Sequence, residues 1–263
     1  MNLGGRTALV TGASGGLGHA IVRALARRGA SVVLTARRTE VLEPLAAETG
    51  GRAVPCDLAD RAAVERLVEA AGPVDVLVSN AGLPASGAID SFSIEAIDRA
   101  LDVNLRAPMV LARLMCEGMA ARGGGHIVFV SSLSGKAGTV GTSVYAATKF
   151  GLRGFAMGLR EDLRPRGVGV STVFPGFIRD AGLFHDSGGK LPAYVGTKTP
   201  EDVAAAVVSA IERDRSEVVV APLFLRVGTA FAGLAPEVAA IVQRRLGATE
   251  LATQFEDGQR DKR

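Results

Sequence analysis

The chain has 263 residues, of which 48% are hydrophobic and 22% charged, and its net formal charge is +3. This composition is that of a globular protein and excludes a collagen-like or disordered chain. The 25 arginines and 5 lysines are dispersed in short pairs, so no basic stripe indicates nucleic-acid binding. No run reaches the roughly 20 apolar residues of a membrane-spanning helix, and the N-terminus lacks the apolar centre of a signal peptide. We therefore expect a cytoplasmic protein.

Cysteine and histidine are scarce. The only cysteines are Cys56 and Cys116, which provide neither a disulfide framework nor a metal-ligand pattern. The three histidines also lack metal-binding spacing. We expect no bound metal.

Short β-branched runs alternate with longer stretches of helical spacing along the chain. Strands that are apolar on both faces and separated by helix-length segments predict a parallel sheet covered by helices on each side. Right-handed crossovers then favour a doubly wound α/β sheet, a single-domain Rossmann fold of seven strands over residues 1–246 with a polar, flexible tail over 247–263. The predicted strands are Thr7–Thr11, Ser31–Thr35, Arg52–Cys56, Val74–Ser79, His126–Ser131, Val168–Phe174 and Glu217–Val220.

A glycine-rich turn follows the first predicted strand and opens the first predicted helix. A tight turn needs positive φ, and the backbone must approach a pyrophosphate closely while the helix packs near the sheet. The N–H groups and dipole of the helix N-terminus then hold the anion. The alternative is a turn with no ligand. The context favours dinucleotide binding by Gly12, Ser14, Gly15, Gly16, Leu17 and Gly18.

The end of the second predicted strand indicates which nucleotide binds. NAD-binding folds usually carry an acidic residue there to hold the ribose diol, whereas this chain reads Ala36-Arg37-Arg38. Ala36 exerts no repulsion on a 2′-phosphate, and Arg37 offers a planar fork suited to one. The alternative is that both arginines begin a solvated loop. We expect NADP(H) to be preferred, with NAD(H) possible.

One of the two tyrosines in the chain, Tyr145, lies four residues before Lys149, one of the five lysines. On a helix this spacing puts both side chains on one face. Ser132 closes a predicted strand, and strand ends on this side of a parallel sheet face the ligand crevice. The alternative for the Tyr145 and Lys149 pair is a buried ring beside a lysine that reaches solvent.

From about Thr7 to Val220 the sequence resembles the short-chain dehydrogenase/reductase family. The resemblance rests on the glycine-rich turn and on Asp57, Asn80-Ala81-Gly82, Asn104, Ser132, Tyr145, Lys149 and Pro175-Gly176. It implies that Asn104, Ser132, Tyr145 and Lys149 form a catalytic tetrad. It also implies further cofactor contacts from Asp57, Leu58, Asn80, Ala81, Gly82, Pro175, Gly176 and Ile178, together with Tyr145 and Lys149.

The chemistry of carbonyl reduction suits these side chains. A tyrosine hydroxyl can protonate the carbonyl oxygen while Ser132 holds that oxygen. By the resemblance, Lys149 stabilises the tyrosinate and bonds the nicotinamide ribose, and Asn104 fixes a water that returns the proton. A free tyrosine titrates near ~10, so it acts more readily as an acid than as a base at neutral pH. We therefore expect reduction to be the favoured direction.

Three positions depart from the family pattern. Ser79 precedes Asn80 where the family more often has a second asparagine. Asp180 stands where the family commonly has a threonine that reaches the nicotinamide amide. Gly15 lacks the basic side chain that some NADP-dependent members carry in the loop, so Arg37 and Arg38 would bear the phosphate preference.

The segment Phe177–Gly196 is expected to form a mobile loop over the substrate, with an apolar inner surface of Phe177, Leu183, Phe184, Leu191 and Tyr194. A C-terminal apolar cap over residues 221–246 could add a second wall, made of Leu223, Phe224, Leu225, Val227, Phe231 and Leu234. This arrangement favours a lipophilic ketone or aldehyde. The alternatives are ordinary core, a subunit interface or peripheral contact with a membrane.

The leading hypothesis is an NADP(H)-dependent enzyme that interconverts a carbonyl compound and its secondary alcohol. A second is a non-catalytic NADP(H)-binding sensor, and a third, a sugar-nucleotide epimerase, would need a longer substrate domain. The family resemblance implies a homodimer or homotetramer that uses the helices Arg106–Ala121 and Tyr145–Leu163.

Overall fold

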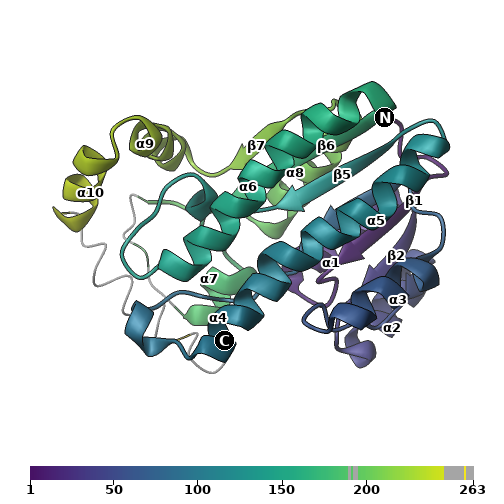
Figure 1. Ribbon diagram of the computed structural model, residues 1–263, viewed down its shortest axis with the longest axis horizontal. Coiled ribbons are helices and arrows are strands. Elements are labelled where there is room, and N and C mark those ends of the chain that lie inside the picture. The colour runs from purple at the N-terminus through teal and green to yellow at the C-terminus, as the bar shows by residue number, and fades with distance from the viewer. Residues whose placement is uncertain (189–190, 192–194, 246–257, 259–263) are drawn as a thin grey trace.

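The fold is built around a parallel sheet, described here from a computed structural model that covers residues 1–188, 191, 195–245 and 258 (Figure 1). The strand order within this part of the chain is β3-β2-β1-β4-β5-β6-β7, and every neighbouring pair is parallel. The strands are β1 (Thr7–Thr11), β2 (Ser31–Thr35), β3 (Arg52–Ala53), β4 (Val76–Ser79), β5 (Gly125–Val130), β6 (Val168–Pro175) and β7 (Glu217–Val220).

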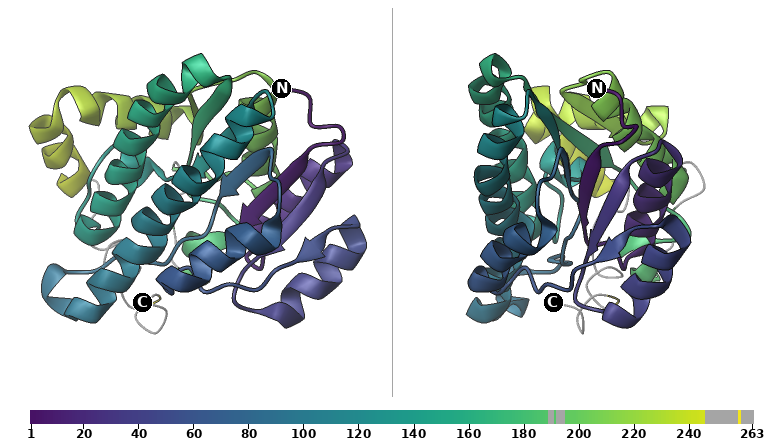
Figure 2. Two further views of the ribbon diagram at one scale, coloured as in Figure 1. Left: turned by 45° about the vertical axis from the view of Figure 1, so that its right-hand side comes forward. Right: turned by 90° about the vertical axis from the view of Figure 1, so that its right-hand side faces the viewer.

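Helices cover both faces of the sheet, as the edge-on view in Figure 2 shows. One face is covered by α1 (Gly16–Arg27), α2 (Thr39–Thr49) and α8 (Pro200–Glu212). The other is covered by α3 (Arg61–Ala71), α5 (Ala107–Ala121) and α6 (Ser143–Leu163). The remaining helical segments are η1 (Ile89–Ser91), α4 (Ile94–Leu101), η2 (Asp102–Arg106), η3 (Leu133–Gly135), η4 (Arg164–Arg166), α7 (Gly182–Ser187), α9 (Leu223–Leu234) and α10 (Pro236–Arg245).

The predicted doubly wound sheet is confirmed, and its strands show why. Ala8, Leu9 and Val10 of β1 are fully buried, with Leu9 in the core on one face and its two neighbours in the core on the other. The strand order reverses between β1 and β4, and ligands of such sheets bind at the carboxyl ends of the strands near this switch point.

The predicted strand boundaries agree with the structure except at the sheet edge. β1, β2 and β7 have the predicted bounds, and the bounds of β4, β5 and β6 differ by one or two residues. The prediction of a strand over Arg52–Cys56 was too long, because β3 ends at Ala53. The N–H groups of Val54 and Cys56 still donate to the oxygens of Leu34 and Ala36, at 2.8 and 3.0 Å, so the chain stays beside β2 after the strand ends. Pro55 lies between these two donors, at a position facing away from β2, where an edge strand tolerates proline.

The segment predicted as a substrate loop is partly helical, because Gly182–Ser187 forms α7. The rings of Phe177 and Phe184 meet edge to face, with centroids 5.2 Å apart. Ile178 pairs with Lys198 in a short parallel bridge, which ties the start of the segment to its end. Tyr194, predicted to belong to the inner surface, lies outside the described residues.

The two C-terminal helices α9 and α10 pack on each other and project from the sheet, at the upper left of Figure 1. Most of the apolar side chains predicted to form a second wall are exposed: Leu223, Phe224, Val227, Phe231 and Leu234. These exposures exclude the core interpretation for those five residues. Among the described residues, no helix is both long and apolar enough to cross a membrane. The predicted tail over 247–263 falls almost entirely outside the described residues.

Candidate active site

The glycine-rich turn between β1 and α1 depends on glycine at two positions. Gly12 has φ +64°, and a Cβ there would lie 2.7 Å from the Cα of Ala81. A Cβ on Gly18 would lie 2.3 Å from the carbonyl oxygen of Gly12. Gly15 precedes α1 without a side chain to cap it, and Gly16–His19 contains no carboxylate. The first N–H groups of α1 are therefore suited to an anion.

Thr11 links the ends of β1 and β4, a role that the sequence analysis missed. Its buried Oγ1 accepts hydrogen bonds from the backbone N–H groups of Asn80 and Ala81, both at 3.0 Å. Asn80 Nδ2 donates in return to the carbonyls of Thr11 and Gly12, at 3.1 and 3.2 Å. The signal in the sequence was a polar residue that closes an apolar strand. This network holds the glycine turn against the strand that Asn80 follows.

Asn80 also supplies an acceptor. Its Oδ1 is buried, and it has no hydrogen-bond partner within the described part of the chain. A buried polar atom usually finds a partner, so this oxygen is suited to a ligand or to water at the switch point. Together with the uncapped start of α1, it shows that the residues present fit a dinucleotide.

Arg37 and Arg38 differ in their surroundings. Arg38 Nη2 donates to the backbone oxygen of Ser14 at 3.0 Å and lies 3.4 Å from its Oγ, so it braces the glycine turn. Arg37 is exposed, and no hydrogen bond or ion pair joins it to another residue that the structure describes. Arg37 is thus the cation available to a phosphate at the end of β2.

His19 also lies near this turn, although the sequence analysis gave it no role. Burial, and then the charge of Arg23, lower the pKa of its imidazole. Its Nε2 is buried and has no partner among the described residues. The neutral imidazole of His19 therefore places an unpaired ring nitrogen, Nε2, at the first turn of α1.

Ser132 and Tyr145 lie close together at the carboxyl end of β5. Ser132 lies two residues after the end of β5 and directly before η3, where its Oγ accepts the backbone N–H of Ser134 at 3.1 Å. Tyr145 lies in the first turn of α6, with its hydroxyl near Ser132. Burial around the hydroxyl raises the pKa of Tyr145 to about 12, and the neighbouring Ser132 side chain opposes this only in part. The phenol is therefore protonated at neutral pH.

Lys149 lies one helical turn after Tyr145, on the same face of α6. Only 3% of Lys149 is exposed, and its Nζ donates to the backbone oxygen of Val130 at 3.2 Å. The Nζ is 5.5 Å from the centroid of the Tyr145 ring. Burial lowers the pKa of the ammonium to about 8, so Lys149 still carries a charge at pH 7.

Asn104 is fully buried in the π-turn η2, which joins α4 to α5. Its Oδ1 accepts the N–H of Leu83 at 2.7 Å, and its Nδ2 donates to the oxygen of Leu83 at 3.0 Å. A Cβ added to Gly82 would lie 3.6 Å from Asn104 Oδ1 and 3.7 Å from Lys149 Nζ. Asn104 and Lys149 therefore approach the same point above Gly82.

Two further residues of the structure position Lys149, and the sequence analysis did not single them out. Ser131 Oγ donates to the backbone oxygen of Lys149 at 3.2 Å. A Cβ on Gly135 would lie 2.6 Å from that Oγ and 2.8 Å from the same backbone oxygen. The glycine lets η3 approach α6 closely, which holds Ser132 next to Tyr145. Only the proximity of Ser131 to Ser132 in the sequence hinted at this contact.

The other predicted cofactor residues lie around the same edge of the sheet. Asp57 Oδ1 accepts the N–H of Ala59 at 3.0 Å, its Oδ2 pairs with Arg99 at 3.4 Å, and Leu58 is buried. Pro175 ends β6, and a Cβ on the following Gly176 would lie 3.2 Å from Leu133 of η3. Ile178 is buried.

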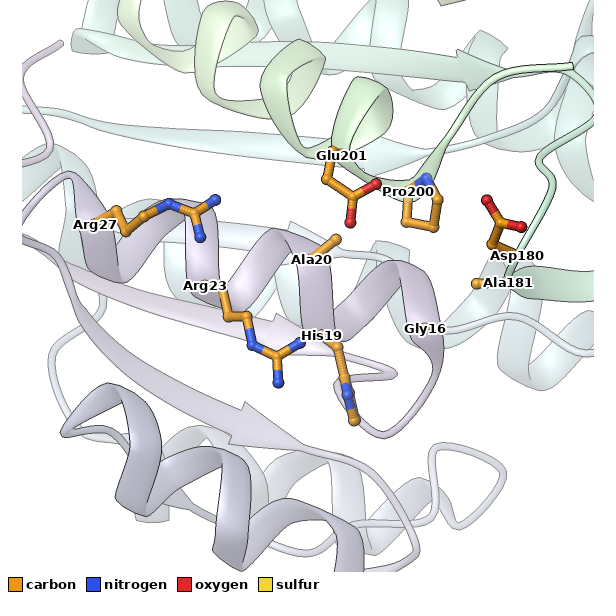
Figure 3. A pocket seen from close by; sticks show the side chains of 9 residues that line it. All are labelled: Gly16, His19, Ala20, Arg23, Arg27, Asp180, Ala181, Pro200 and Glu201. Carbon is orange, nitrogen blue, oxygen red and sulfur yellow. The ribbon is translucent and has the colours of Figure 1, made fainter.

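Asp180 lies at the edge of this region, away from the tetrad. It has φ +69° and pairs with Arg179 at 3.3 Å, with both side chains largely exposed. It lines a groove of about 350 Å³ between α1 and the start of α8, which Figure 3 shows together with Arg23, Arg27 and Glu201. None of the four residues predicted to form the catalytic tetrad lines this groove.

The fold and the anion-binding turn define the class of protein, a dinucleotide-binding α/β protein of the Rossmann type. Comparison with known proteins then narrows this class. The profile of the family described as short chain dehydrogenase matches residues 6–188. This chain belongs to that family and is an oxidoreductase of the kind that binds NAD(P).

Relatives of known sequence support this assignment. The ketoacyl reductase HetN of a Nostoc species is 39% identical over 227 residues, which are 83% of this chain and 79% of HetN. The 3-oxoacyl-[acyl-carrier-protein] reductase FabG of Rickettsia conorii is 36% identical, over 68% of this chain and 75% of FabG. A cyclic-di-GMP-binding biofilm dispersal mediator protein of Escherichia coli is 38% identical, over 77% of this chain and 88% of its own.

A solved structure from Beutenbergia cavernae, named for gluconate 5-dehydrogenase and containing bound NADP, has a TM-score of 0.74. It is 32% identical and covers 83% of this chain and 96% of its own.

Proposed function

We propose that the protein is an NADP(H)-dependent reductase that converts a lipophilic ketone or aldehyde to the alcohol. The observation that carries this proposal is that the buried Tyr145 hydroxyl lies near Ser132 and beside the buried ammonium of Lys149. Such a set can protonate a carbonyl oxygen, which is the part of the reaction that the protein itself must perform.

In this mechanism the carbonyl oxygen of the substrate accepts hydrogen bonds from Ser132 Oγ and Tyr145 Oη. The phenol gives up its proton as charge develops on that oxygen, and Ser132 holds the oxygen in place. The nearby ammonium of Lys149 stabilises the resulting tyrosinate. Asn104 faces the same point as Lys149 and would hold a water that returns the proton. Bound NADPH would supply the hydride.

Three observations support NADPH as the preferred cofactor. Arg37 is exposed at the end of β2 and has no partner among the described residues, and Ala36 places no carboxylate beside it. The relative from Beutenbergia cavernae contains NADP. The pyrophosphate would bind the start of α1, with Gly12, Gly16 and Gly18 allowing its close approach and Arg38 bracing the turn.

The direction and the substrate follow from the protonation state and the surroundings of the site. With its pKa raised to about 12, Tyr145 is an acid at neutral pH, which favours reduction over oxidation. The edge-to-face pair of Phe177 and Phe184 supplies an apolar surface in the segment after β6. Two of the relatives are named ketoacyl reductases, so acyl-chain ketones are the first substrates to test.

The proposal is tested by measuring NADPH oxidation with a series of ketones from small and polar to long-chain, using wild type, Tyr145→Phe and Ser132→Ala. We expect kcat to fall by about 10²- to 10⁴-fold in both variants, because each loses a group that acts on the carbonyl oxygen. NADPH binding, measured by fluorescence, should remain. Ser134→Ala is the matched control, because Ser134 bonds Ser132 through its backbone. Comparable turnover in Tyr145→Phe would refute the mechanism.

A second candidate is a binding protein that senses NADP(H) or another nucleotide. The name of the Escherichia coli relative, a cyclic-di-GMP-binding mediator protein, favours it. The proton-transfer set of Ser132, Tyr145, Lys149 and Asn104 favours the enzyme, since a sensor has no use for it. Tight NADPH binding without turnover on any carbonyl of the series would favour the sensor.

We also propose a cytoplasmic homodimer or homotetramer that uses α5 and α6. Both helices present exposed apolar side chains: Met109, Leu114, Phe150 and Met157. Burial of such side chains between subunits would stabilise the assembly. Sedimentation velocity measures the state directly.

A further inference from the structure

The apolar stripe of α9 faces away from the protein. Leu223, Val227, Phe231 and Leu234 recur at helical spacing and share one face within a stripe of roughly 100°. Their exposed fractions are 72%, 61%, 45% and 86%. The opposite face, which contains Ala232, is the one turned inward. This orientation is the reverse of an ordinary surface helix, which buries its apolar stripe.

The neighbouring helix continues the exposed apolar surface. Val238 and Ile241 of α10 are 50% and 45% exposed, and they lie one turn apart on the same face. The two helices project from the body of the protein as an arm (Figure 1). Exposed apolar side chains on a projecting amphipathic helix are suited to insertion into the interface of a membrane.

The charges of the arm indicate what covers it. In the sequence, no carboxylate occurs between Glu217 and Glu237, and the only charged residue in that interval is Arg226. Arg226 is exposed on α9 beside the apolar stripe. If two copies met through α9 alone, this segment would provide no carboxylate for either arginine. The phosphates of anionic lipids can each pair with one Arg226 side chain. These phosphates lie at the membrane surface, just above the acyl region that the apolar stripe would enter.

We propose that the α9–α10 arm docks the protein on the surface of a membrane that contains anionic lipids. The stripe of Leu223, Val227, Phe231 and Leu234 enters the interface, and Arg226 contacts the headgroups. The arm lies on the membrane and does not cross it. This inference does not depend on the proposed reductase activity, because docking is measured without turnover.

The test is flotation of the full chain with vesicles of phosphatidylcholine and phosphatidylglycerol in equal parts, and with vesicles of phosphatidylcholine alone. We expect wild type to float with the anionic vesicles. Leu223→Gln, Phe231→Gln and Leu234→Gln combined should lower the partition constant at least about tenfold, because three inserted apolar side chains are lost. The matched control replaces three exposed apolar residues on η1 and α4, Ile89, Ile94 and Leu101, with glutamine and should float like wild type.

A single substitution, Arg226→Glu, tests membrane docking independently, in case the triple variant does not fold. Arg226→Glu replaces an exposed side chain and should weaken binding to anionic vesicles by about 30-fold while leaving binding to neutral vesicles nearly unchanged. Failure of wild type to float, or equal losses in the control and the arm variants, would overturn the proposal. The proposal would also be overturned if the triple variant bound vesicles like wild type but had a different oligomeric mass in sedimentation. That result would show that the arm is an interface between copies of the chain.

Discussion

Lys149 is buried without a carboxylate to balance it. Its Nζ bonds the backbone oxygen of Val130, and it has no ion pair among the described residues. Lowering its pKa from 10.5 to about 8 corresponds to about 3 kcal/mol of unfavourable burial of the charge. The folded protein therefore holds a buried and unbalanced positive charge beside Tyr145. A tyrosinate or a hydrogen bond to a bound ribose would stabilise that charge. In the proposed mechanism, the charge that Lys149 supplies to catalysis therefore lowers the stability of the folded protein.

At the same scale, Arg37→Ala tests the cofactor preference. Loss of the guanidinium should raise KM for NADPH by about 10- to 100-fold while leaving KM for NADH unchanged, because only NADPH carries the 2′-phosphate. Steady-state kinetics with both cofactors provide the measurement. Arg166→Ala removes another exposed arginine, on η4 before β6, and should change neither value. Equal changes in KM for NADPH and for NADH would show that Arg37 does not recognise the 2′-phosphate.

The sequence indicated where Ser132, Tyr145 and Lys149 lie but not all of the contacts that position them. The four-residue spacing of Tyr145 and Lys149 and the place of Ser132 after a strand follow from helix and strand periodicity. Periodicity could not distinguish Arg37 from Arg38, because the bond from Arg38 to Ser14 joins residues brought close only by the fold. For the same reason the contact of Ser131 with the backbone of Lys149 was not foreseen.

At the scale of elements, the approach of α1 to the sheet depends on Gly18. A Cβ on Gly18 would lie 2.3 Å from the Gly12 oxygen and 2.7 Å from the Cα of Ala13, and both are backbone atoms that cannot yield cheaply. Gly18→Ala should displace the start of α1 and weaken NADPH binding at least about tenfold, together with a lower Tm. Fluorescence titration and thermal unfolding measure the two effects.

Gly154→Ala in α6 is the matched control, because nothing lies within 4 Å of a Cβ there and the residue is exposed. Alanine is the better helix former, so this variant should be more stable by up to ~1 kcal/mol with normal cofactor binding. A destabilised Gly154→Ala, or a Gly18→Ala that binds normally, would contradict the steric argument.

The elements themselves were predicted unevenly. Buried strands such as β1 have near-continuous apolar runs, which the sequence displays directly. The apolar stripe of α9 was equally visible, but its direction was not, because periodicity defines a face and only the tertiary structure decides where that face points. The end of β3 could not be located from the sequence, because the chain stays bonded to β2 through Val54 and Cys56 after the strand ends.

At the scale of the whole molecule, His126 couples folding to pH. Its Nε2 lies 2.8 Å from Ser171 Oγ, which joins β5 to β6, and it is 2% exposed. Burial lowers the pKa of His126 to about 4. The nearby charge of Asp214 opposes this, while the N-terminal amine and Arg160 reinforce it. The unfolded chain therefore takes up a proton at a higher pH than the folded one does.

The sign follows from this difference. Because the folded pKa is below the ordinary value of 6.5, the contribution to stability is complete above pH 6.5 and falls as the pH drops toward 4, by about 3 kcal/mol in total. Urea unfolding between pH 7 and pH 5 measures the upper part of this slope. His126→Gln should flatten it, whereas His185→Gln, at an exposed position, should leave it unchanged. An identical slope in His126→Gln would exclude this histidine as the cause.

The direction in which Asn104 points depends on the number of residues in the helix that contains its π-turn. From Ile94 to Ala121 the chain is continuously helical, and Asp102–Arg106 is the one stretch of it in π rather than α geometry. Removing one residue from that stretch would restore regular α-helix and rotate one half of the rod by about 100° relative to the other. Asn104 would then turn away from Leu83 while the rod gained regular hydrogen bonds. Here a single deletion would make the protein more helical and would remove Asn104 from the place where we propose that it holds a water.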